Sequence, residues 1–424
     1  MLISFESRKT ARQVWLNQKQ DSTTISLDEE IVYSFDLEGR LLSAWQDNQT
    51  YIRTLDNRII KKWHEPSPMD TWKSIQELGE LEIENVLGRV YRTARDLADQ
   101  LESRELFLKG DPKERTQLQT AASQCLRQIT TWDVARYKLD RLNFQKVYSP
   151  VSILPPDQYY ALVLQATVGC HWNRCTFCDF YRDVRFHIRT AEEFLEHLKA
   201  VRAFIGEGIR LRKSIFLGDA NALVTPQELL LVIFDLVQQE FPNTGGATPS
   251  TSHDSIFGRG IYSFLDVFTG EKKSLHDFQE LKARNLKRVY VGIETGSDEL
   301  LKFLNKPATS AQALEVVSAI KDSGINVGII ILAGVGGNRY FESHVLETAD
   351  LLNALHLGRG DLVYFSPLWD NEGSEYLLRA AEAGIRPLTS EEKRSQVATI
   401  RSGLHFIEGQ EPKFALYDIR EFVY

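Results

Sequence analysis

A short loop with three cysteines constrains this chain more than any other stretch of its sequence. Cys170, Cys175 and Cys178 lie in the spacing C-x4-C-x2-C, directly after an apolar run over residues 159–166. The apolar run predicts a buried strand, so the thiols are expected in the loop that follows it. Thiolates are soft ligands that select zinc or iron–sulfur clusters, and the spacing therefore indicates a metal site.

Three kinds of metal site are compatible with this spacing. A closed zinc site needs a fourth ligand, for which His171 and His187 are the nearby histidines. A plant-type [2Fe–2S] loop shares the spacing but needs another cysteine downstream, and none follows Cys178. A [4Fe–4S] cluster held by three cysteines would leave one iron open for a substrate or a cofactor.

Composition limits what surrounds the loop. The chain has 424 residues, 43% of them hydrophobic, and roughly 100–200 residues per domain predicts two or three domains. The net charge is −8 without a basic block, so a nucleic-acid partner is not expected. The first residues lack an apolar signal core, and no apolar run approaches about 18 residues, so no membrane span is expected. Four cysteines, three of them clustered, make no disulfide framework, which favours the cytoplasm.

The first third of the chain predicts an α+β module, residues 1–150. Residues 30–63 alternate short β-type runs with turn pairs, as in an antiparallel meander. From about residue 72 to residue 101, apolar residues recur at helical spacing, and a second helix is expected over residues 112–132. Cys125 lies on the apolar stripe of that second helix, so we expect it to pack in a core.

From residue 159 onward, strands alternate with helices. Such alternation predicts an α/β fold, a partial (β/α)6 TIM-like barrel over residues 151–370 with a short C-terminal helical extension over residues 371–424. Apolar residues on both faces of several strands indicate a parallel sheet covered by helices. The tail predicts one helix and a short strand-like end, and residues 243–260 predict a polar loop. The expected strands are residues 159–166, 214–218, 261–268, 288–294, 326–334 and 362–366.

Active sites of such barrels lie at the carboxyl ends of the strands, which selects further candidates. Glu294 could accept hydrogen bonds from a ligand, or it could simply be paired with a neighbouring Arg or Lys. Asp266 is expected inside an apolar strand, where it would face a ligand or be satisfied structurally. Tyr181 could donate a hydrogen or shield the loop. The other candidates are Asp219, Asn221, Lys272, Lys273, Ser297, Arg339 and residues 369–372, with Arg182 and Arg185 beside the loop.

Several motifs occur in the order found in radical S-adenosylmethionine (radical SAM) enzymes, which the chain resembles from about residue 159 to residue 369. The cysteine loop follows the first strand, and Phe177 precedes the last cysteine, as is usual in that family. The family more commonly has C-x3-C-x2-C, so the extra residue is a departure. The later strands end in family-like segments, namely Gly218-Asp219, residues 292–297 (GIETGS), residues 334–337 (GVGG) and residues 366–368 (SPL).

The resemblance implies that Cys170, Cys175 and Cys178 hold three irons of a [4Fe–4S] cluster and that SAM binds the fourth. Reductive cleavage of SAM would then give a 5′-deoxyadenosyl radical that abstracts hydrogen from a substrate. A flavodoxin or ferredoxin is the expected electron donor. The resemblance implies cofactor contacts by Phe177 at the cluster, Gly218 and Asp219 at the methionine end, Glu294 and Ser297 at the ribose, and Gly334 and Leu368 at the adenine.

The substrate is not determined by these motifs. Their wording is similar to a branch that includes oxygen-independent coproporphyrinogen oxidase and Elongator-type proteins, but Phe180 stands where the former has a further cysteine. We expect a small-molecule substrate, with modification of tRNA or protein as the alternative. A non-catalytic zinc-binding scaffold is the alternative from a different class. Asp266 and Tyr181 are the expected catalytic residues.

Overall fold

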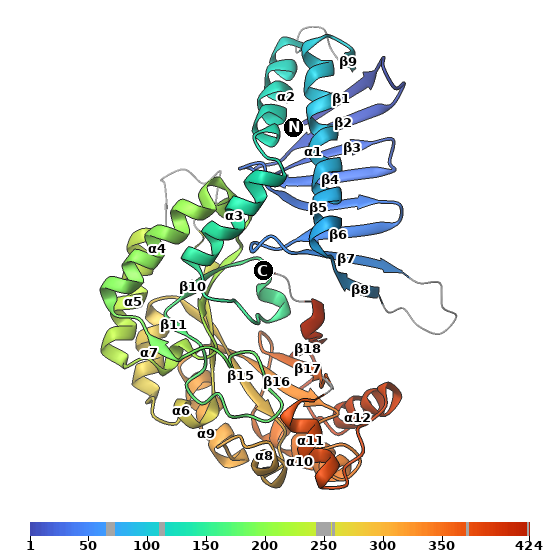
Figure 1. Ribbon diagram of the computed structural model, residues 1–424. Helices are drawn as coiled ribbons and strands as arrows, with labels where there is room; N and C mark the ends of the chain where they lie inside the picture. The colour runs from blue at the N-terminus through green and yellow to red at the C-terminus, as the bar shows by residue number, and fades with distance from the viewer. Residues whose placement is uncertain (65–72, 110–114, 243–255, 257–258, 370–372, 422–423) are drawn as a thin grey trace. The chain divides into compact units, whose positions relative to one another are not determined.

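The computed structural model describes residues 1–64, 73–109, 115–242, 256, 259–369, 373–421 and 424 (Figure 1). The predicted polar loop over residues 243–260 lies mostly outside the described residues, as do residues 370–372. Within those described ranges, no helix is long and apolar enough to cross a membrane. The chain divides into two compact units. The N-terminal unit comprises Met1–Pro150, Ala200–Arg212 and Val423–Tyr424, and the barrel unit comprises Val151–Lys199 and Lys213–Phe422.

The N-terminal unit is built on a nine-stranded antiparallel sheet (Figure 1). The strands β8 to β1 are neighbours in chain order, and β9 pairs with the free side of β1. The predicted meander over residues 30–63 is confirmed as β4 to β7, and β1 to β3 extend it toward the N-terminus. The strands are β1 (Leu2–Ser7), β2 (Gln13–Gln18), β3 (Ser22–Leu27), β4 (Ile31–Asp36), β5 (Leu41–Gln46), β6 (Gln49–Arg53), β7 (Ile59–His64), β8 (Lys73–Glu77) and β9 (Leu106–Lys109).

Helices cover one face of this sheet. Figure 1 shows α1 (Glu80–Glu102) lying across the strands, followed by α2 (Arg115–Thr130) and α3 (Val134–Val147). Tyr91 and Ile129 pack in one hydrophobic core with the alternate, inward-facing residues of the strands. Cys125 is 6% exposed in this core, which confirms its predicted packing role. The first helix begins later than residue 72, because the residues before it form β8.

The barrel unit contains a seven-stranded sheet in which every neighbouring pair is parallel. The six predicted strands are confirmed, and the strand-like end of the tail joins the sheet as a seventh, β18. The sheet order runs from β10 to β18 in chain order, which leaves these two as its edges and makes an incomplete barrel. The strands are β10 (Ala161–Gln165), β13 (Ser214–Gly218), β14 (Ile261–Leu265), β15 (Leu286–Glu294), β16 (Asn326–Ala333), β17 (Leu362–Pro367) and β18 (Lys413–Leu416).

Helices connect these strands, as the alternating pattern predicts. One strand end differs from the prediction, because β14 stops at Leu265 and the next residue caps a short helix. The helices are α4 (Ala191–Ile205), α5 (Gln227–Glu240), α6 (Val267–Gly270), α7 (Leu275–Ala283), α8 (Asp298–Phe303), α9 (Ser310–Asp322), α10 (Phe341–Ala354), α11 (Glu375–Glu382) and α12 (Ser390–Ser402).

One carboxylate joins two strands of the barrel in their amino-terminal halves. Asp157, in the single-turn helix Pro156–Gln158 before β10, accepts hydrogen bonds from three side chains on two strands. The donors are Arg288 Nη1 at 2.9 Å, the Tyr290 hydroxyl at 2.6 Å and the Tyr364 hydroxyl at 2.8 Å. Hydrogen bonds to a charged acceptor are stronger than neutral ones, so this cluster fixes the floor of the barrel.

Two glycines of the barrel unit offer a matched test of its packing. Gly337 (φ +52°) and Gly384 (φ +67°) both have left-handed backbones, which cost other residues about 1 kcal/mol. A Cβ on Gly337 would lie 2.3 Å from the Arg386 carbonyl oxygen, whereas one on Gly384 meets nothing within 4 Å. We expect Gly337→Ala to lower the free energy of unfolding by at least about 2 kcal/mol more than Gly384→Ala, measured by urea denaturation. Equal losses in the two variants would contradict the close contact.

Candidate active site

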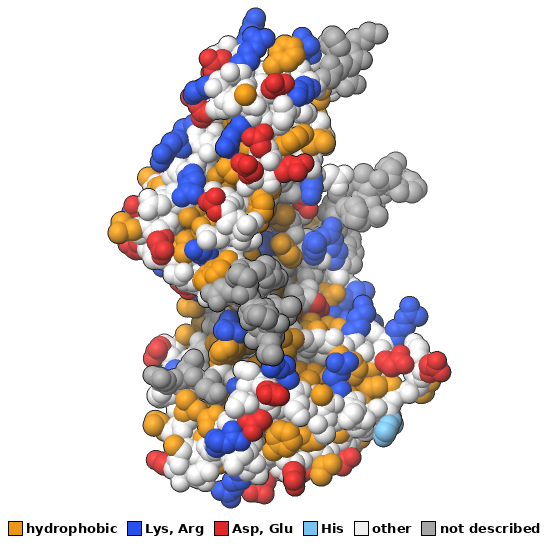
Figure 2. All heavy atoms as spheres, turned by 90° about the vertical axis from the view of Figure 1, so that its right-hand side faces the viewer, with side chains coloured by type: hydrophobic (Ala, Val, Ile, Leu, Met, Phe, Trp, Pro, Cys, Tyr) orange, Lys and Arg blue, Asp and Glu red, His pale blue; other side chains and the backbone are white. Residues whose placement is uncertain are grey.

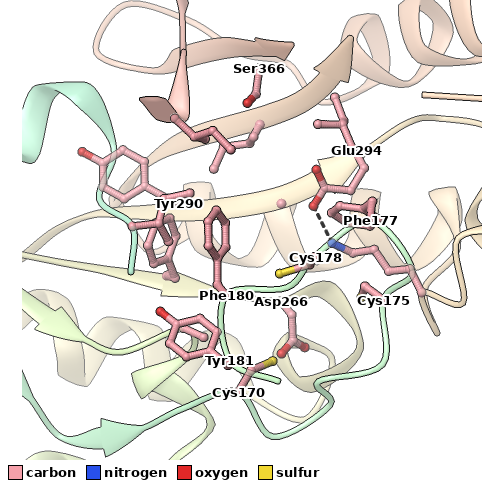
Figure 3. Close-up of a pocket in the computed structure, with 18 of the residues that line it drawn as sticks. Cys170, Cys175, Phe177, Cys178, Phe180, Tyr181, Asp266, Tyr290, Glu294 and Ser366 are labelled. Atoms are coloured by element: carbon pink, nitrogen blue, oxygen red, sulfur yellow. Dashed lines mark hydrogen bonds and ion pairs between the residues drawn. The ribbon is translucent and has the colours of Figure 1, made fainter. Parts of the chain in front are cut away.

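A cavity of about 390 Å³ opens at the carboxyl ends of the barrel strands (Figure 3). Strands β14 to β17 supply part of its wall, and the cysteine loop supplies the rest, so residues far apart in sequence meet here. Parallel strands end at one edge of the sheet, which is why the site forms there. The loop residues that line it are Cys170, Cys175, Phe177, Cys178, Asp179, Phe180 and Tyr181.

The base of the cysteine loop is closed by a small antiparallel ribbon. The strand β11 (Thr167–Val168) pairs with β12 (His187–Ile188), so the loop leaves and returns at one place. Gly169 begins the loop with a left-handed backbone (φ +75°), and a Cβ there would lie 3.1 Å from Val184 Cγ1. A side chain at the residue before the first cysteine would therefore be strained, which favours glycine there.

The loop is held against the end of α8 by hydrogen bonds. Trp172 Nε1 donates to the Asn305 carbonyl at 2.9 Å, and the Thr176 amide donates to the Leu304 carbonyl at 3.0 Å. Arg182, a residue of the loop itself, also holds the loop backbone. Its guanidinium donates to the Cys175 carbonyl at 2.7 Å and to the Asn173 carbonyl at 3.0 Å. Arg182 therefore braces the loop backbone, a role that sequence reasoning did not propose.

The three loop thiols line the cavity as free cysteines. Burial raises the pKa of Cys175 to about 11 and that of Cys178 to about 12, and a bound metal would favour their thiolate forms. Over the described part of the chain, no group of three or more His, Cys, Asp or Glu residues is placed to hold a single metal ion. Soft thiol donors that open onto one shared cavity fit an iron–sulfur cluster.

Asp219 is directed to the base of the loop. Its carboxylate accepts hydrogen bonds from Gln165 Nε2 at 3.2 Å and from the Gly169 amide at 3.3 Å, and its amide donates to Thr167 Oγ1 at 3.1 Å. Burial raises the pKa of Asp219 to about 7. Neither Asp219 nor the neighbouring Gly218 lines the cavity, although both were predicted to contact the cofactor.

An ion pair is buried in the wall of the cavity next to the loop. Lys306 Nζ lies 2.7 Å from Glu294 Oε1, and the two side chains are 8% and 10% exposed (Figure 3). Glu294 ends β15 with a left-handed backbone (φ +67°). The structure thus shows Glu294 lining the cavity and paired with a lysine, and its predicted contact with a ligand stays a prediction. Sequence reasoning missed Lys306, since its only signal is a lysine shortly after the short helix α8.

Asp266 lies in the cavity wall as the N-cap of α6, not inside a strand as predicted. Its carboxylate accepts from the Thr269 amide at 2.7 Å and from the side chain of Asn221, and it lies 3.5 Å from His171 Nε2. The strand prediction failed because the carboxylate satisfies the first amides of a new helix. In this network Asn221 Oδ1 and His171 Nδ1 are buried, and neither has a hydrogen-bond partner among the described residues.

The other predicted residues divide into those that reach the cavity and those that do not. Tyr181 is 4% exposed and lines it, as do Phe177 and Leu368, which share a hydrophobic cluster. Ser297 is the N-cap residue of α8, and its buried hydroxyl has no hydrogen-bond partner in the part of the chain described. Gly334 instead donates its amide to Gln396 Oε1 at 2.7 Å. Ser297 and Gly334 do not line the cavity, nor do Lys272, Lys273, Arg182, Arg185 and Arg339.

Comparison with known proteins assigns this unit to a family. Residues 164–352 match the model of the radical SAM superfamily. No curated protein sequence matches the chain. Similar solved structures include the cobalamin-dependent S-adenosylmethionine radical enzyme OxsB, at 16% identity over 57% of this chain and 31% of that one, with a TM-score of 0.36.

Two further solved structures are similar over the same share of this chain. Coproporphyrinogen III oxidase (HemN) from Escherichia coli is 13% identical over 57% of this chain and 52% of that one, with a TM-score of 0.40. The methyltransferase TsrM from Kitasatospora setae is 20% identical over 57% and 45%, with a TM-score of 0.37. The chain thus spans about a third to a half of the length of these proteins. At such scores, the family model carries the assignment.

Residues 164–352, a little under half of the chain, therefore form a radical SAM domain. Members of this superfamily are enzymes whose cofactors are a [4Fe–4S] cluster and SAM, and which need a reductant and a substrate. The predicted family, α/β fold class and cofactors are confirmed. The roles of individual site residues stay predictions.

The raised pKa of Asp219 makes a pH-dependent stability test possible. The folded-state pKa of about 7 exceeds the ordinary aspartate value, so folding takes up a proton between about pH 4 and pH 7. The contribution of the neutral carboxyl to the free energy of unfolding is therefore complete near pH 4 and is lost as the pH rises through 7. Asp219→Asn should remove this loss, so its free energy of unfolding should fall less than that of the wild type over this range, measured by urea denaturation. Parallel pH profiles would show that Asp219 does not titrate in this way.

Proposed function

We propose that this protein reductively cleaves SAM at a [4Fe–4S] cluster held by Cys170, Cys175 and Cys178 and uses the resulting 5′-deoxyadenosyl radical to abstract hydrogen from a small-molecule substrate. The observation that carries the proposal is the shared cavity, onto which three thiols and a buried Glu–Lys pair open together. When bound, the cluster and SAM supply the one-electron chemistry that generates the radical. The residues of the chain bind, orient and shield them.

The Glu294–Lys306 pair supports a polar end of the SAM site. Lys306 is a buried ammonium beside Cys175 and could bind the carboxylate of the methionine moiety, while Glu294 could accept from the ribose hydroxyls. Each group lowers the desolvation cost of the other before SAM arrives, since a buried charge needs a partner. Ser297, Gly218, Asp219 and Gly334 were also predicted to contact the cofactor. They do not line the cavity, and we propose that they support the residues that do.

Apolar groups complete the proposed cofactor site. Phe177 lies beside Cys178 in sequence and packs in the hydrophobic cluster that contains Leu332 and Leu368, which could enclose the adenine. Tyr181 is buried beside the loop cysteines, and burial raises its pKa well above the ordinary tyrosine value, so the neutral phenol could shield the cluster or donate a hydrogen atom. Asp266 is the proposed polar contact on the opposite wall. Exclusion of water by these groups would protect a reactive intermediate.

We propose a flavodoxin or ferredoxin as the reductant and the cytoplasm as the location, since a reducing compartment keeps the loop thiols available. Residues 151–370 would form the catalytic core, flanked by a module over residues 1–150 and an extension over residues 371–424. Modification of tRNA or protein is the alternative activity. Figure 2 shows acidic and basic side chains interspersed on the face that it draws, and together with the net charge of −8 this favours a small molecule over a nucleic acid.

Removal of a single loop thiol tests the cluster. We expect Cys175→Ala to lose most of its iron and sulfide after anaerobic reconstitution and to form no 5′-deoxyadenosine with SAM and dithionite. Cys125→Ala is the matched control, because that thiol is buried in the N-terminal unit and should leave both values unchanged. Zinc at one per chain without sulfide, or four irons without 5′-deoxyadenosine, would refute the proposed function.

Substitution of Lys306 tests the polar end of the SAM site. Lys306→Met removes the buried cation and should weaken SAM binding by about tenfold or more, because a charge-assisted pair is worth at least 1.4 kcal/mol. Lys306→Arg keeps the charge and should retain most of the affinity, measured by equilibrium dialysis of labelled SAM. Circular dichroism would establish that both variants are folded. Unchanged SAM affinity in folded Lys306→Met would exclude the assigned contact.

A further inference from the structure

The cavity has a second part, which the proposed cofactor contacts use only at Tyr181. Figure 3 shows the rings of Phe180, Tyr181 and Tyr290 on one side of the cavity, with Glu294 and Phe177 on the other. Tyr290 lies four positions before the end of β15, so the aromatic side reaches below the strand ends into the barrel. Phe264 is the register partner of Tyr290 on β14, and Ile330 and Tyr417 also line this part of the cavity.

The polar atoms of these deep tyrosines are turned away from the cavity. The Tyr290 hydroxyl donates to Asp157 at 2.6 Å, and the Tyr417 hydroxyl donates to the Leu154 carbonyl at 2.7 Å. Both hydroxyls are therefore satisfied by the protein, and the two tyrosines present mainly ring carbon to a ligand. A substrate that placed a polar group beside them would lose its hydrogen bonds to water without replacement.

The charged groups that line the cavity are also partnered within the protein. Lys306 is the single cation among the described lining residues, and it is held by Glu294. Asp266 accepts from Thr269 and Asn221, and Asp179 lies 3.6 Å from Arg182 Nε. An anionic substrate would find no cation in the described wall beyond the lysine that we assign to SAM. A buried anion without a partner is strongly disfavoured.

We infer that the substrate places an uncharged, apolar group, alkyl or aromatic, in this deep part of the cavity. The inference rests on the proposed function, because it names the substrate class of the same site. Burial of such a group among ring and aliphatic carbon is favourable in proportion to the apolar area removed from water. Phosphorylated and carboxylate-rich substrates are disfavoured for the reacting portion.

Matched pairs of probes test this substrate class on the full-length protein, reconstituted anaerobically with its cluster and saturated with SAM. The probes are indole against indole-3-carboxylate and n-octanol against octanoate, with binding measured by titration calorimetry. We expect each neutral probe to bind at least about tenfold more tightly than its carboxylate. Stronger binding of indole would assign an aromatic group, and stronger binding of octanol would assign an alkyl group. Equal or tighter binding of the carboxylates, or no binding of either neutral probe, would overturn the inference.

A lysine introduced into the cavity wall tests whether the probes bind in this cavity. Ile153 lines the cavity and is only half-buried, so Ile153→Lys should fold and should reverse the preference toward the carboxylates. Leu346→Lys is the control, because Leu346 is 65% exposed on α10 of the same unit and lies outside the cavity lining. An unchanged preference in folded Ile153→Lys would place probe binding elsewhere and so contradict the inference.

The same samples separate this inference from the proposed function. Iron content and 5′-deoxyadenosine formation are measured on each preparation before titration. Normal 5′-deoxyadenosine formation without a preference for neutral probes would overturn only the substrate class. Failure to hold four irons or to cleave SAM would overturn the proposed function itself.

Discussion

The parallel pairing of seven strands is the constraint on which the site depends. Because all seven strands point the same way, their last residues gather at one edge, and the loop that carries Cys170 meets Glu294 and Ser366 from distant parts of the chain. The hydrogen bonds to Asp157 join two of these strands, β15 and β17, in their amino-terminal halves. The barrel is therefore held at its floor, and its upper edge is available for chemistry.

The cysteine loop has little regular structure of its own, and side chains and backbone bonds around it set its course. Asp219 binds its base, Arg182 binds two of its carbonyls, and the end of α8 receives Trp172 and Thr176. Several independent tethers hold the three thiols in place before any cofactor binds. Such preorganisation means that cofactor binding does not have to order the loop.

The charged side chains in the cavity wall are paired with other groups of the protein, and this pairing decides which parts of the cavity are polar. Glu294 and Lys306 neutralise each other. The Tyr290 hydroxyl donates a hydrogen bond to Asp157 and does not face the cavity. A cavity with this lining combines a polar end, which we propose for the methionine moiety of SAM, with a deep apolar part. The radical chemistry of the family and the proposed apolar substrate are compatible for the same reason, since both need water to be excluded.

The sequence by itself determined the strand-and-helix alternation, the cysteine loop, the family and the structural role of Cys125, because hydrophobic period and cysteine spacing are local patterns. It could not place Lys306 opposite Glu294, turn Asp219 toward Gly169, or make Asp266 a helix cap instead of a strand residue. Those outcomes depend on which polar group finds a partner across the fold, and burial makes an unpartnered group costly. Only the tertiary structure decided them, since the competing partners lie far apart in the chain.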